Sequence, residues 1–300
     1  MATLLYFEDE RDPALRLAAA CSLPSACIES HRFPDDELRL RLPVNATGGM
    51  DSTLVIYRSL DRPNDKLIQL LLTIREARAL GAQRILLVAP YLAYMRQDIA
   101  FHPGEVVSQR RIGAFLADLV DGLITVDPHL HRISRLDEAI PLNYAIVLNG
   151  ATALSDCITQ HLEAPLLIGP DAESAQWVKA AAARHGWEYG VCTKIRRGDH
   201  AVEIELPNRS VQGRAVVLLD DVASSGRTLA VACQQLLQAG AQSVDVAVTH
   251  ALFAHDALDV IRQAGARHVW STDCITHPSN AIFMAPMLSE PIDGWLRLGQ

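Results

Sequence analysis

A short pattern occurs three times in the chain and constrains its fold more than any other feature. In each copy, a stretch of helical composition ends in Gly-Ala and one polar residue, and a run rich in β-branched residues follows. The copies begin at Gly81, Gly240 and Gly265. Glycine suits the left-handed position just after a helix, so each copy predicts a helix that feeds a strand. Strands that alternate with helices predict an α/β fold whose mostly parallel sheets are flanked by helices.

Further strands and helices are predicted between and around these copies. The expected strands are 54–57, 85–88, 123–126, 145–148, 166–168, 215–219, 244–248 and 268–270, and the expected helices are 65–80 (capped by Asn64), 171–184 and 227–238. The charged segment 194–212 breaks the alternation, and we interpret it as a hairpin that projects from the second sheet. A length of 300 residues fits two domains of about 150 residues better than one. No flexible linker marks the boundary, which we place near residue 145.

Composition excludes several classes of protein. Hydrophobic residues make up 49% and charged residues 21% of the chain, so it can bury cores and is not a disordered protein. The formal net charge of −8 argues against a protein that grips a nucleic-acid backbone. The six cysteines form no CxxC pair that would indicate a zinc site. The acidic start does not resemble a signal peptide, and no apolar run reaches the roughly 18 residues of a membrane helix. We therefore expect a cytoplasmic protein.

Residues 215–229 carry most of the functional information. An apolar strand leads into Asp220 and Asp221, then into the loop Ser224-Ser225-Gly226-Arg227-Thr228 and a helix. Adjacent carboxylates can hold the hydroxyls of a sugar, directly or through Mg²⁺, and N–H groups at a helix N-terminus favour a phosphate. The segment predicts a cradle for a ribose phosphate at the edge of an α/β sheet. The competing interpretation is an ordinary strand, loop and helix with a serine N-cap. The segment is neither a Walker A loop nor a GxGxxG turn.

This segment resembles the phosphoribosyl pyrophosphate (PRPP) loop of type I phosphoribosyltransferases and of ribose-phosphate pyrophosphokinases. Four other segments resemble the second family, in order and at matching spacing: 32–37, 90–98, 126–129 and 194–197. The resemblance implies a tandem of two type I phosphoribosyltransferase-like domains. They are an ATP-binding domain at 1–145 and a ribose 5-phosphate-binding domain at 146–300, whose last residues can pack back on the first domain.

The resemblance also implies an activity. Members of the family are transferases of nucleotide biosynthesis that move the β,γ-pyrophosphoryl group of MgATP to O1 of ribose 5-phosphate and form PRPP and AMP. The implied ATP contacts are Phe33, Asp35 and Glu37 for adenine, reaching ATP from a neighbouring subunit, and Arg96, Gln97 and Asp98 after a strand. Taken alone, these residues favour plainer roles, namely a strand end with a buried phenylalanine and solvated acids, and a solvated arginine.

The implied metal and catalytic residues come from three other places. His129 matches the family's histidine beside Mg²⁺ and the triphosphate, and Asp171 matches its metal- and ribose-binding aspartate. Lys194 and Arg196 match the catalytic pair of its flexible loop. Lysine is rare here, with three among 27 basic residues. It offers a point charge, and arginine a bidentate fork, for phosphoryl oxygens. The alternatives are a structural histidine, an aspartate that caps a helix and a solvated basic hairpin.

Two departures from the family bear on binding and regulation. Its loop is usually Asp-Thr-Gly-Gly-Thr, whereas Ser224 and Arg227 replace the acid and a glycine here; binding of the 5-phosphate is still expected. Where many members carry a basic run that binds phosphate or ADP in a hexamer, residues 99–105 contain one acid and no Lys or Arg. This resembles the archaeal-type branch, so we expect activity without added phosphate and a homodimer or homotetramer. Two rival functions remain: a phosphoribosyltransferase that consumes PRPP, and a non-catalytic regulatory subunit.

Overall fold

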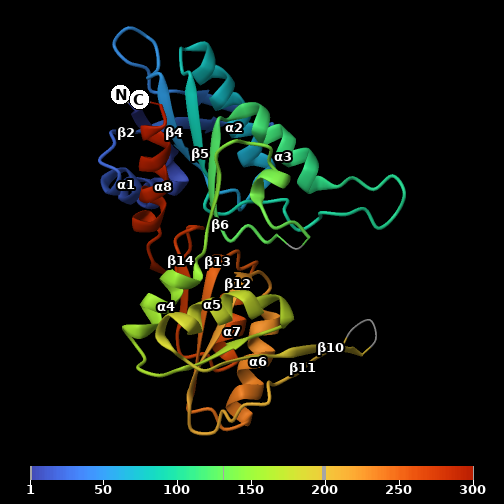
Figure 1. Ribbon diagram of the computed structural model, residues 1–300. Coiled ribbons are helices and arrows are strands. Elements are labelled where there is room, and N and C mark those ends of the chain that lie inside the picture. The colour runs from blue at the N-terminus through green and yellow to red at the C-terminus, as the bar shows by residue number, and fades with distance from the viewer. Residues whose placement is uncertain (1, 131, 198–200, 300) are drawn as a thin grey trace. The chain divides into compact units, whose positions relative to one another are not determined.

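The computed structural model describes residues 2–130, 132–197 and 201–299, and the side chains of residues 194–203 also lie outside this description. The chain divides into two compact units, Met1–Leu148 with Met284–Gln300, and Asn149–Phe283 (Figure 1). The first passage between the units falls next to the boundary placed near residue 145, and the chain returns to the first unit at residue 284. Each unit has the α/β architecture that the sequence predicts.

The first unit is built on a seven-stranded sheet in the order β3-β2-β1-β4-β5-β6-β7. Its strands are β1 (Ala2–Phe7), β2 (Ser25–Arg32), β3 (Leu38–Arg41), β4 (Thr53–Tyr57), β5 (Arg84–Val88), β6 (Gly122–Val126) and β7 (Ala145–Leu148). Its helices are η1 (Glu8–Glu10), α1 (Arg11–Ala20), α2 (Pro63–Ala79), α3 (Ser108–Leu119), η2 (Leu136–Glu138) and α8 (Ala285–Arg297), where η marks a 3₁₀ helix. Only β2 and β3 pair antiparallel, so the other strands bring their carboxyl ends to one edge.

The central strands β4, β5 and β6 are buried on both faces, which explains why they are continuously apolar, whereas β2 and β3 at one side of the sheet are largely exposed. On one face, Leu54 and Ile56 pack with residues of α2 and α3, including Leu70 and Leu116. On the other face α1 and α8 pack together and against the sheet (Figure 1). A Cβ on Gly122 of β6 would lie 2.9 Å from Nε1 of Trp295, so α8 approaches the sheet closely at that point.

The second unit holds a six-stranded parallel sheet in the order β15-β14-β13-β12-β8-β9 and a separate two-stranded hairpin. The sheet strands are β8 (Leu166–Gly169), β9 (Tyr189–Val191), β12 (Ala215–Ala223), β13 (Ser243–Ala251), β14 (Val269–Thr272) and β15 (Asn280–Ile282). The hairpin is β10 (Thr193–Arg197) with β11 (Ala201–Glu205), and the helices are α4 (Ala151–Thr159), η3 (Ala172–Ser174), α5 (Ala175–His185), α6 (Arg227–Gln238) and α7 (Ala257–Gln263). The hairpin extends away from the sheet of its unit, as segment 194–212 predicts (Figure 1).

Several predicted elements are confirmed and three are corrected. Helix 227–238 and strand 145–148 have the predicted bounds, and the glycines of the repeated pattern have φ of 107°, 90° and 100°. Asn64 does not cap α2, because Pro63 takes the first helical position and the side chain of Asn64 contacts the Tyr94 hydroxyl instead. Strand 215–219 continues to Ala223, since β12 stays paired with β13. The helix expected at 171–184 is divided between η3 and α5.

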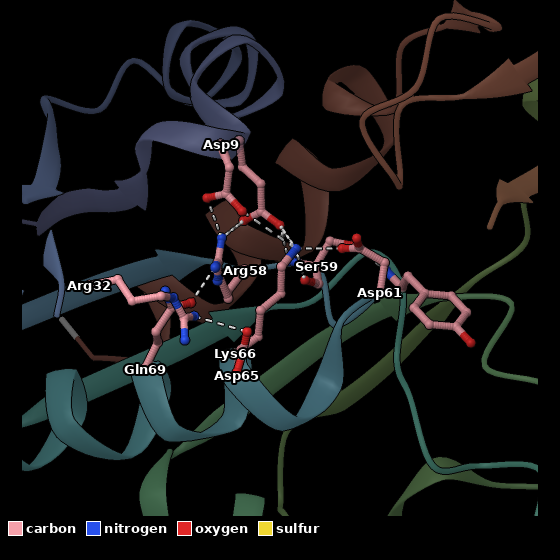
Figure 2. A network of polar contacts seen from close by, with 10 residues as sticks. Asp9, Arg32, Arg58, Ser59, Asp61, Asp65, Lys66 and Gln69 are labelled. Atoms are coloured by element: carbon pink, nitrogen blue, oxygen red, sulfur yellow. Dashed lines mark hydrogen bonds and ion pairs between the residues drawn. The ribbon is translucent and has the colours of Figure 1, made fainter. Parts of the chain in front are cut away.

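A buried polar network lies where β1 and β4 end (Figure 2). Glu10, Arg58 and Lys66 are each at most 4% exposed. The Lys66 ammonium lies 2.7 Å from a Glu10 carboxylate oxygen and 2.8 Å from the Ser59 carbonyl oxygen, and it also contacts Asp61. The Arg58 guanidinium lies 2.6 Å from Asp9 and 3.2 Å from Glu10. Burial raises the pKa of Glu10, although the cations of Arg58 and Lys66 lower it. The ion pairs among these residues therefore stabilise their charged forms in the core.

The same network fixes the backbone at the start of a loop that carries candidate site residues. The Ser59 N–H donates to Glu10 at 3.1 Å, and the Ser59 hydroxyl accepts from the Tyr91 N–H at 3.1 Å. The Leu60 N–H donates to the Tyr91 carbonyl oxygen at 2.8 Å. The ion pairs at the end of β1 thus position the segment that follows β5.

We expect Lys66→Met to lower the free energy of unfolding by about 3–5 kcal/mol at neutral pH, because it leaves the buried Glu10 carboxylate short of a partner. The loss should be smaller at acidic pH, where Glu10 is protonated. Urea unfolding followed by circular dichroism measures the effect. Lys179→Met, which changes an exposed lysine on α5, is the matched control. Equal unfolding midpoints for the two variants would contradict this account of the network.

Candidate functional site

Three aspartates lie near the carboxyl edge of the second sheet, close enough for the charges of two of them to act on the third. Asp171 follows β8, and Asp220 and Asp221 lie on the adjacent strand β12. The sequence predicts the two aspartates just after a strand, whereas both lie within it. Burial raises the pKa of Asp220 well above its ordinary value, and the charges of Asp221 and Asp171 raise it further. A cation or a set of sugar hydroxyls at this place would relieve that repulsion.

The loop after β12 leaves the N-terminus of α6 open. Gly226 takes the N-cap position with φ of 70°, and no side chain caps the helix there. A Cβ at Gly226 would lie 2.8 Å from the Ala257 carbonyl oxygen, so both the positive φ and the close packing require glycine here. Ser224 and Ser225 are exposed. The interpretation of this segment as a helix with a serine N-cap is therefore wrong, and the N–H groups at the start of α6, with Arg227 and Thr228, can receive an anion.

Asp171 has the capping role that the sequence left open as an alternative. Its carboxylate accepts a hydrogen bond from the Glu173 N–H at 3.1 Å, at the start of η3. The second carboxylate oxygen can still take part in binding, so the cap and a ligand contact are compatible.

At the carboxyl edge of the first sheet, the Arg-Gln-Asp segment follows β5. Arg96 is exposed, whereas Gln97 holds the start of α3: its amide oxygen accepts from the Ser108 N–H at 3.1 Å and from the Ser108 hydroxyl at 2.7 Å. Asp98 is 6% exposed and pairs with Arg132. These contacts leave Arg96 as the member of the segment that faces solvent. Arg132 is not among the residues that the sequence predicts for the site, and no pattern in the sequence points to it.

His129 lies after the neighbouring strand β6 in a constrained turn. Its φ is 38°, as is that of Asp127, and its N–H donates to the Asp127 carbonyl oxygen at 2.9 Å across Pro128. Residues other than glycine rarely adopt a positive φ, and each residue in such a conformation costs on the order of 1–3 kcal/mol of stability. Strained positions of this kind are concentrated at functional sites.

Phe33, Asp35 and Glu37 occupy an exposed turn between β2 and β3. The Phe33 N–H donates to the Glu37 carbonyl oxygen at 2.9 Å, and Phe33 is 39% exposed, so the alternative of a buried phenylalanine is wrong. Because β1 and β4 separate β2 from β5, the end of β2, which Phe33 follows, is about 14 Å across the sheet from the end of β5, which leads into the segment with Arg96.

The candidate residues are divided between the two units. His129 belongs to the first unit and Asp171 to the second. Among the described residues, no three histidine, cysteine, aspartate or glutamate side chains are grouped closely enough to hold a metal ion. Lys194 and Arg196 lie on β10, and their side chains are outside the described part of the chain. No helix in the described ranges is long and apolar enough to cross a membrane.

Comparison with known proteins identifies the family. A model for the N-terminal domain of ribose phosphate pyrophosphokinase matches residues 3–119, and one for the phosphoribosyl transferase domain matches residues 139–285. The ribose-phosphate pyrophosphokinase of Methanopyrus kandleri is 32% identical over 281 residues, which are 93% of this chain and 94% of that protein. The protein of the same name from Methanosarcina acetivorans is 32% identical over 280 residues, 93% of this chain and 95% of that protein.

A solved structure shows the same fold over the full length. The crystal structure of phosphoribosylpyrophosphate synthetase from Mycobacterium smegmatis matches with a TM-score of 0.82 at 21% sequence identity, and it covers 99% of both chains. The two mostly parallel sheets flanked by helices are thus the tandem phosphoribosyltransferase arrangement that the sequence predicts. With the family models and the archaeal relatives, this places the chain in the ribose-phosphate pyrophosphokinase family.

Proposed function

We propose that this protein transfers the β,γ-pyrophosphoryl group of MgATP to O1 of ribose 5-phosphate, giving PRPP and AMP. The observation that carries the proposal is the pairing of a carboxylate cluster on β12 with the uncapped N-terminus of α6. One side of this site suits sugar hydroxyls and the other suits a phosphate. Similarity to ribose-phosphate pyrophosphokinases over 93% of the chain supports the assignment.

Ribose 5-phosphate would bind in the second unit. Its phosphate would receive hydrogen bonds from the N–H groups at the start of α6 and from the hydroxyls of Ser224, Ser225 and Thr228, with the positive charge of Arg227 beside them. Its ring hydroxyls would donate to Asp220 and Asp221. Such hydrogen bonds stabilise the charged form of the carboxylates and offset the repulsion between them.

ATP would bind in the first unit. Arg96 would contact the triphosphate, since it is exposed in the segment that follows β5. Gln97 would contribute through its amide NH₂, because its oxygen is engaged at α3. The turn with Phe33, Asp35 and Glu37 would hold the adenine of an ATP molecule that is bound to a second copy of the chain. Two observations favour this: the turn is exposed, and β2, which leads into it, is three positions from β5 in the sheet.

The chemistry requires positioning and charge neutralisation more than covalent participation. The O1 hydroxyl of the sugar attacks the β-phosphorus, the bond from that phosphorus to the α–β bridging oxygen breaks, AMP leaves with the oxygen, and the O1 proton is released. We assign Lys194 and Arg196 to the transferring phosphoryl oxygens and His129 to the triphosphate. Mg²⁺, for which the oxygen donors of Asp171 and the nucleotide phosphates are suitable ligands, would supply additional charge neutralisation. His129 is the other protein residue that we assign to this metal.

We further propose that the enzyme does not require inorganic phosphate and forms a homodimer or homotetramer, as in the archaeal-type branch. In the loop of residues 99–105, the Glu105 carboxylate accepts from the Phe101 N–H at 2.6 Å and from the His102 N–H at 3.0 Å. These are the backbone donors that an anion would use, and an acidic side chain occupies them. Phosphate would therefore find a negative charge in this loop. The cytoplasmic location expected from the sequence is part of the same proposal.

The reaction itself is the first test. Protein incubated with MgATP and ribose 5-phosphate should form AMP and PRPP in equal amounts, at a rate that does not depend on added phosphate. Release of AMP or ADP at the same rate without the sugar would contradict the proposal. Formation of a nucleotide from PRPP and a free base would favour the phosphoribosyltransferase, and absence of any turnover would favour the regulatory subunit.

Lys194→Ala should lower kcat by about 100-fold, or ~3 kcal/mol, and change KM for either substrate much less, since its charge is used mainly in the transition state. Steady-state kinetics with both substrates varied measures this. Lys179→Ala on α5 is the control for removing a lysine. A variant at position 194 that keeps half of the parent's kcat would show that the hairpin is only a solvated one.

Asp220→Asn should stabilise the unliganded protein at neutral pH while it abolishes binding of the sugar. Because the pKa of Asp220 is raised in the folded state, the stability that this group contributes is present at low pH and is lost as the pH rises through that pKa. Thermal unfolding should show a higher melting temperature for the variant at about pH 7 and a smaller difference at about pH 4. Asp245→Asn is the contrasting control, because the Arg267 guanidinium pairs with the buried Asp245 carboxylate at 2.6 and 3.0 Å. This variant should be less stable than the parent at neutral pH.

A further inference from the structure

We propose that Asp98 and Arg132 form a positioning pair that sets the loop carrying His129 against the Arg-Gln-Asp segment. This inference rests on the proposed function, because it concerns the same ATP site. It departs from the direct ATP contact that the family resemblance implies for Asp98. In its place, it gives Asp98 a role exerted through another loop.

The geometry joins two loops that are far apart in sequence. Nη1 of Arg132 lies 2.5 Å from Oδ1 of Asp98, and the two residues are 34 positions apart. Their side chains differ in environment, since that of Asp98 is 3% exposed and that of Arg132 is 52% exposed. The guanidinium therefore reaches inward from the surface to a carboxylate that is closed off from solvent. A nucleotide cannot reach such a carboxylate without displacing the arginine.

The Asp98 side of the pair is rigidly held. The preceding residue, Gln97, is tied to the start of α3 through both its side chain and its carbonyl oxygen, which accepts from the Gln109 N–H at 3.2 Å. The Gln109 side chain also donates to the Met95 carbonyl oxygen at 3.1 Å. Asp98 is thus a fixed negative charge, and a buried carboxylate is costly unless a cation pairs with it.

The loop with Arg132 needs such an anchor. It leaves β6 through Asp127 and His129, both at φ of 38°. It ends where the buried Leu136 starts η2. Between these ends, Leu130 and Ile133 are only partly buried against the core. The ion pair to Asp98 is a charged contact from the middle of this loop to an element outside it. Because it comes three residues after His129, it limits where that histidine can lie relative to Arg96.

The second carboxylate oxygen of Asp98 makes the residue more dependent on Arg132. Oδ2 is buried and has no hydrogen-bond partner among the described residues. With one of its two oxygens unsatisfied, the carboxylate depends on the guanidinium of Arg132 for compensation. Removing either partner should therefore release the loop as well as remove a charge.

Steady-state kinetics of Asp98→Asn, Arg132→Gln and the double variant test the pair. Each single variant should lower kcat by about 10- to 100-fold, as expected for a misplaced loop, with KM for ATP within about twofold of the parent's because Arg96 and the adenine contacts are intact. The double variant should be no slower than the slower single variant, because both substitutions remove one interaction. Arg132→Lys keeps the charge and should recover part of kcat.

Arg135→Gln is the matched control. Arg135 lies on the same loop and pairs with Asp137, but both are surface residues two positions apart, so the parent's kcat is expected. Two results would overturn the proposal. In one, the single effects multiply in the double variant. In the other, Arg132→Gln raises KM for ATP at unchanged kcat, which would make Arg132 a direct ligand of ATP.

Hydrogen exchange separates this inference from the proposed function. Amides of residues 127–135 should exchange faster in Asp98→Asn than in the parent, with amides of the central strands unchanged, whether or not the parent forms PRPP. Unchanged exchange in 127–135 would show that the pair does not hold the loop. If exchange rises as expected but no PRPP forms, the proposed function is wrong and the anchoring role of the pair is supported.

Discussion

Parallel strands deliver their carboxyl ends to a single edge of a sheet, and the candidate sites of both units depend on this constraint. In the second unit it places Asp171 beside Asp220, although 49 positions separate them in the sequence. In the first unit it places the segments that follow β5 and β6 side by side. The remaining geometry is local: a cap, a turn or an ion pair orients each side chain at that edge.

In the first unit, buried ion pairs stabilise part of the carboxyl edge of the sheet. Glu10, Arg58 and Lys66 lie where β1 and β4 end. These adjacent strands form the topological switch point, because the chain adds β2 on one side of the pair and β5 on the other. In open α/β folds this point is the usual position of a ligand. Here protein side chains occupy it, and the hydrogen bonds of Ser59 carry their order to the loop after β5.

Much of the fold follows from local signals in the sequence, and the site does so only in part. Apolar runs bounded by glycine identify the central strands, and the Asp220–Thr228 segment identifies a candidate site for an anion and a sugar, because the residues that would form it are contiguous in the sequence. The partners of Asp98 and Lys66 could not be found in this way, since each pairing joins residues brought together only by the sheet. The rarity of lysine drew attention to Lys194, yet the same rarity applies to Lys66, which is 4% exposed and structural. Composition cannot distinguish those two environments.

The return of the chain to its first unit has a consequence for how the protein is made. Residues 149–283 form a continuous unit, whereas the first unit needs α8, which leaves the ribosome only after that second unit. Until then the face of the sheet at Gly122 lacks the Trp295 ring, and the Tyr144 hydroxyl lacks the Pro291 carbonyl oxygen that accepts from it at 2.6 Å. The first unit can therefore complete its fold only after the second unit has been synthesised, and until then its uncovered apolar face needs protection from aggregation.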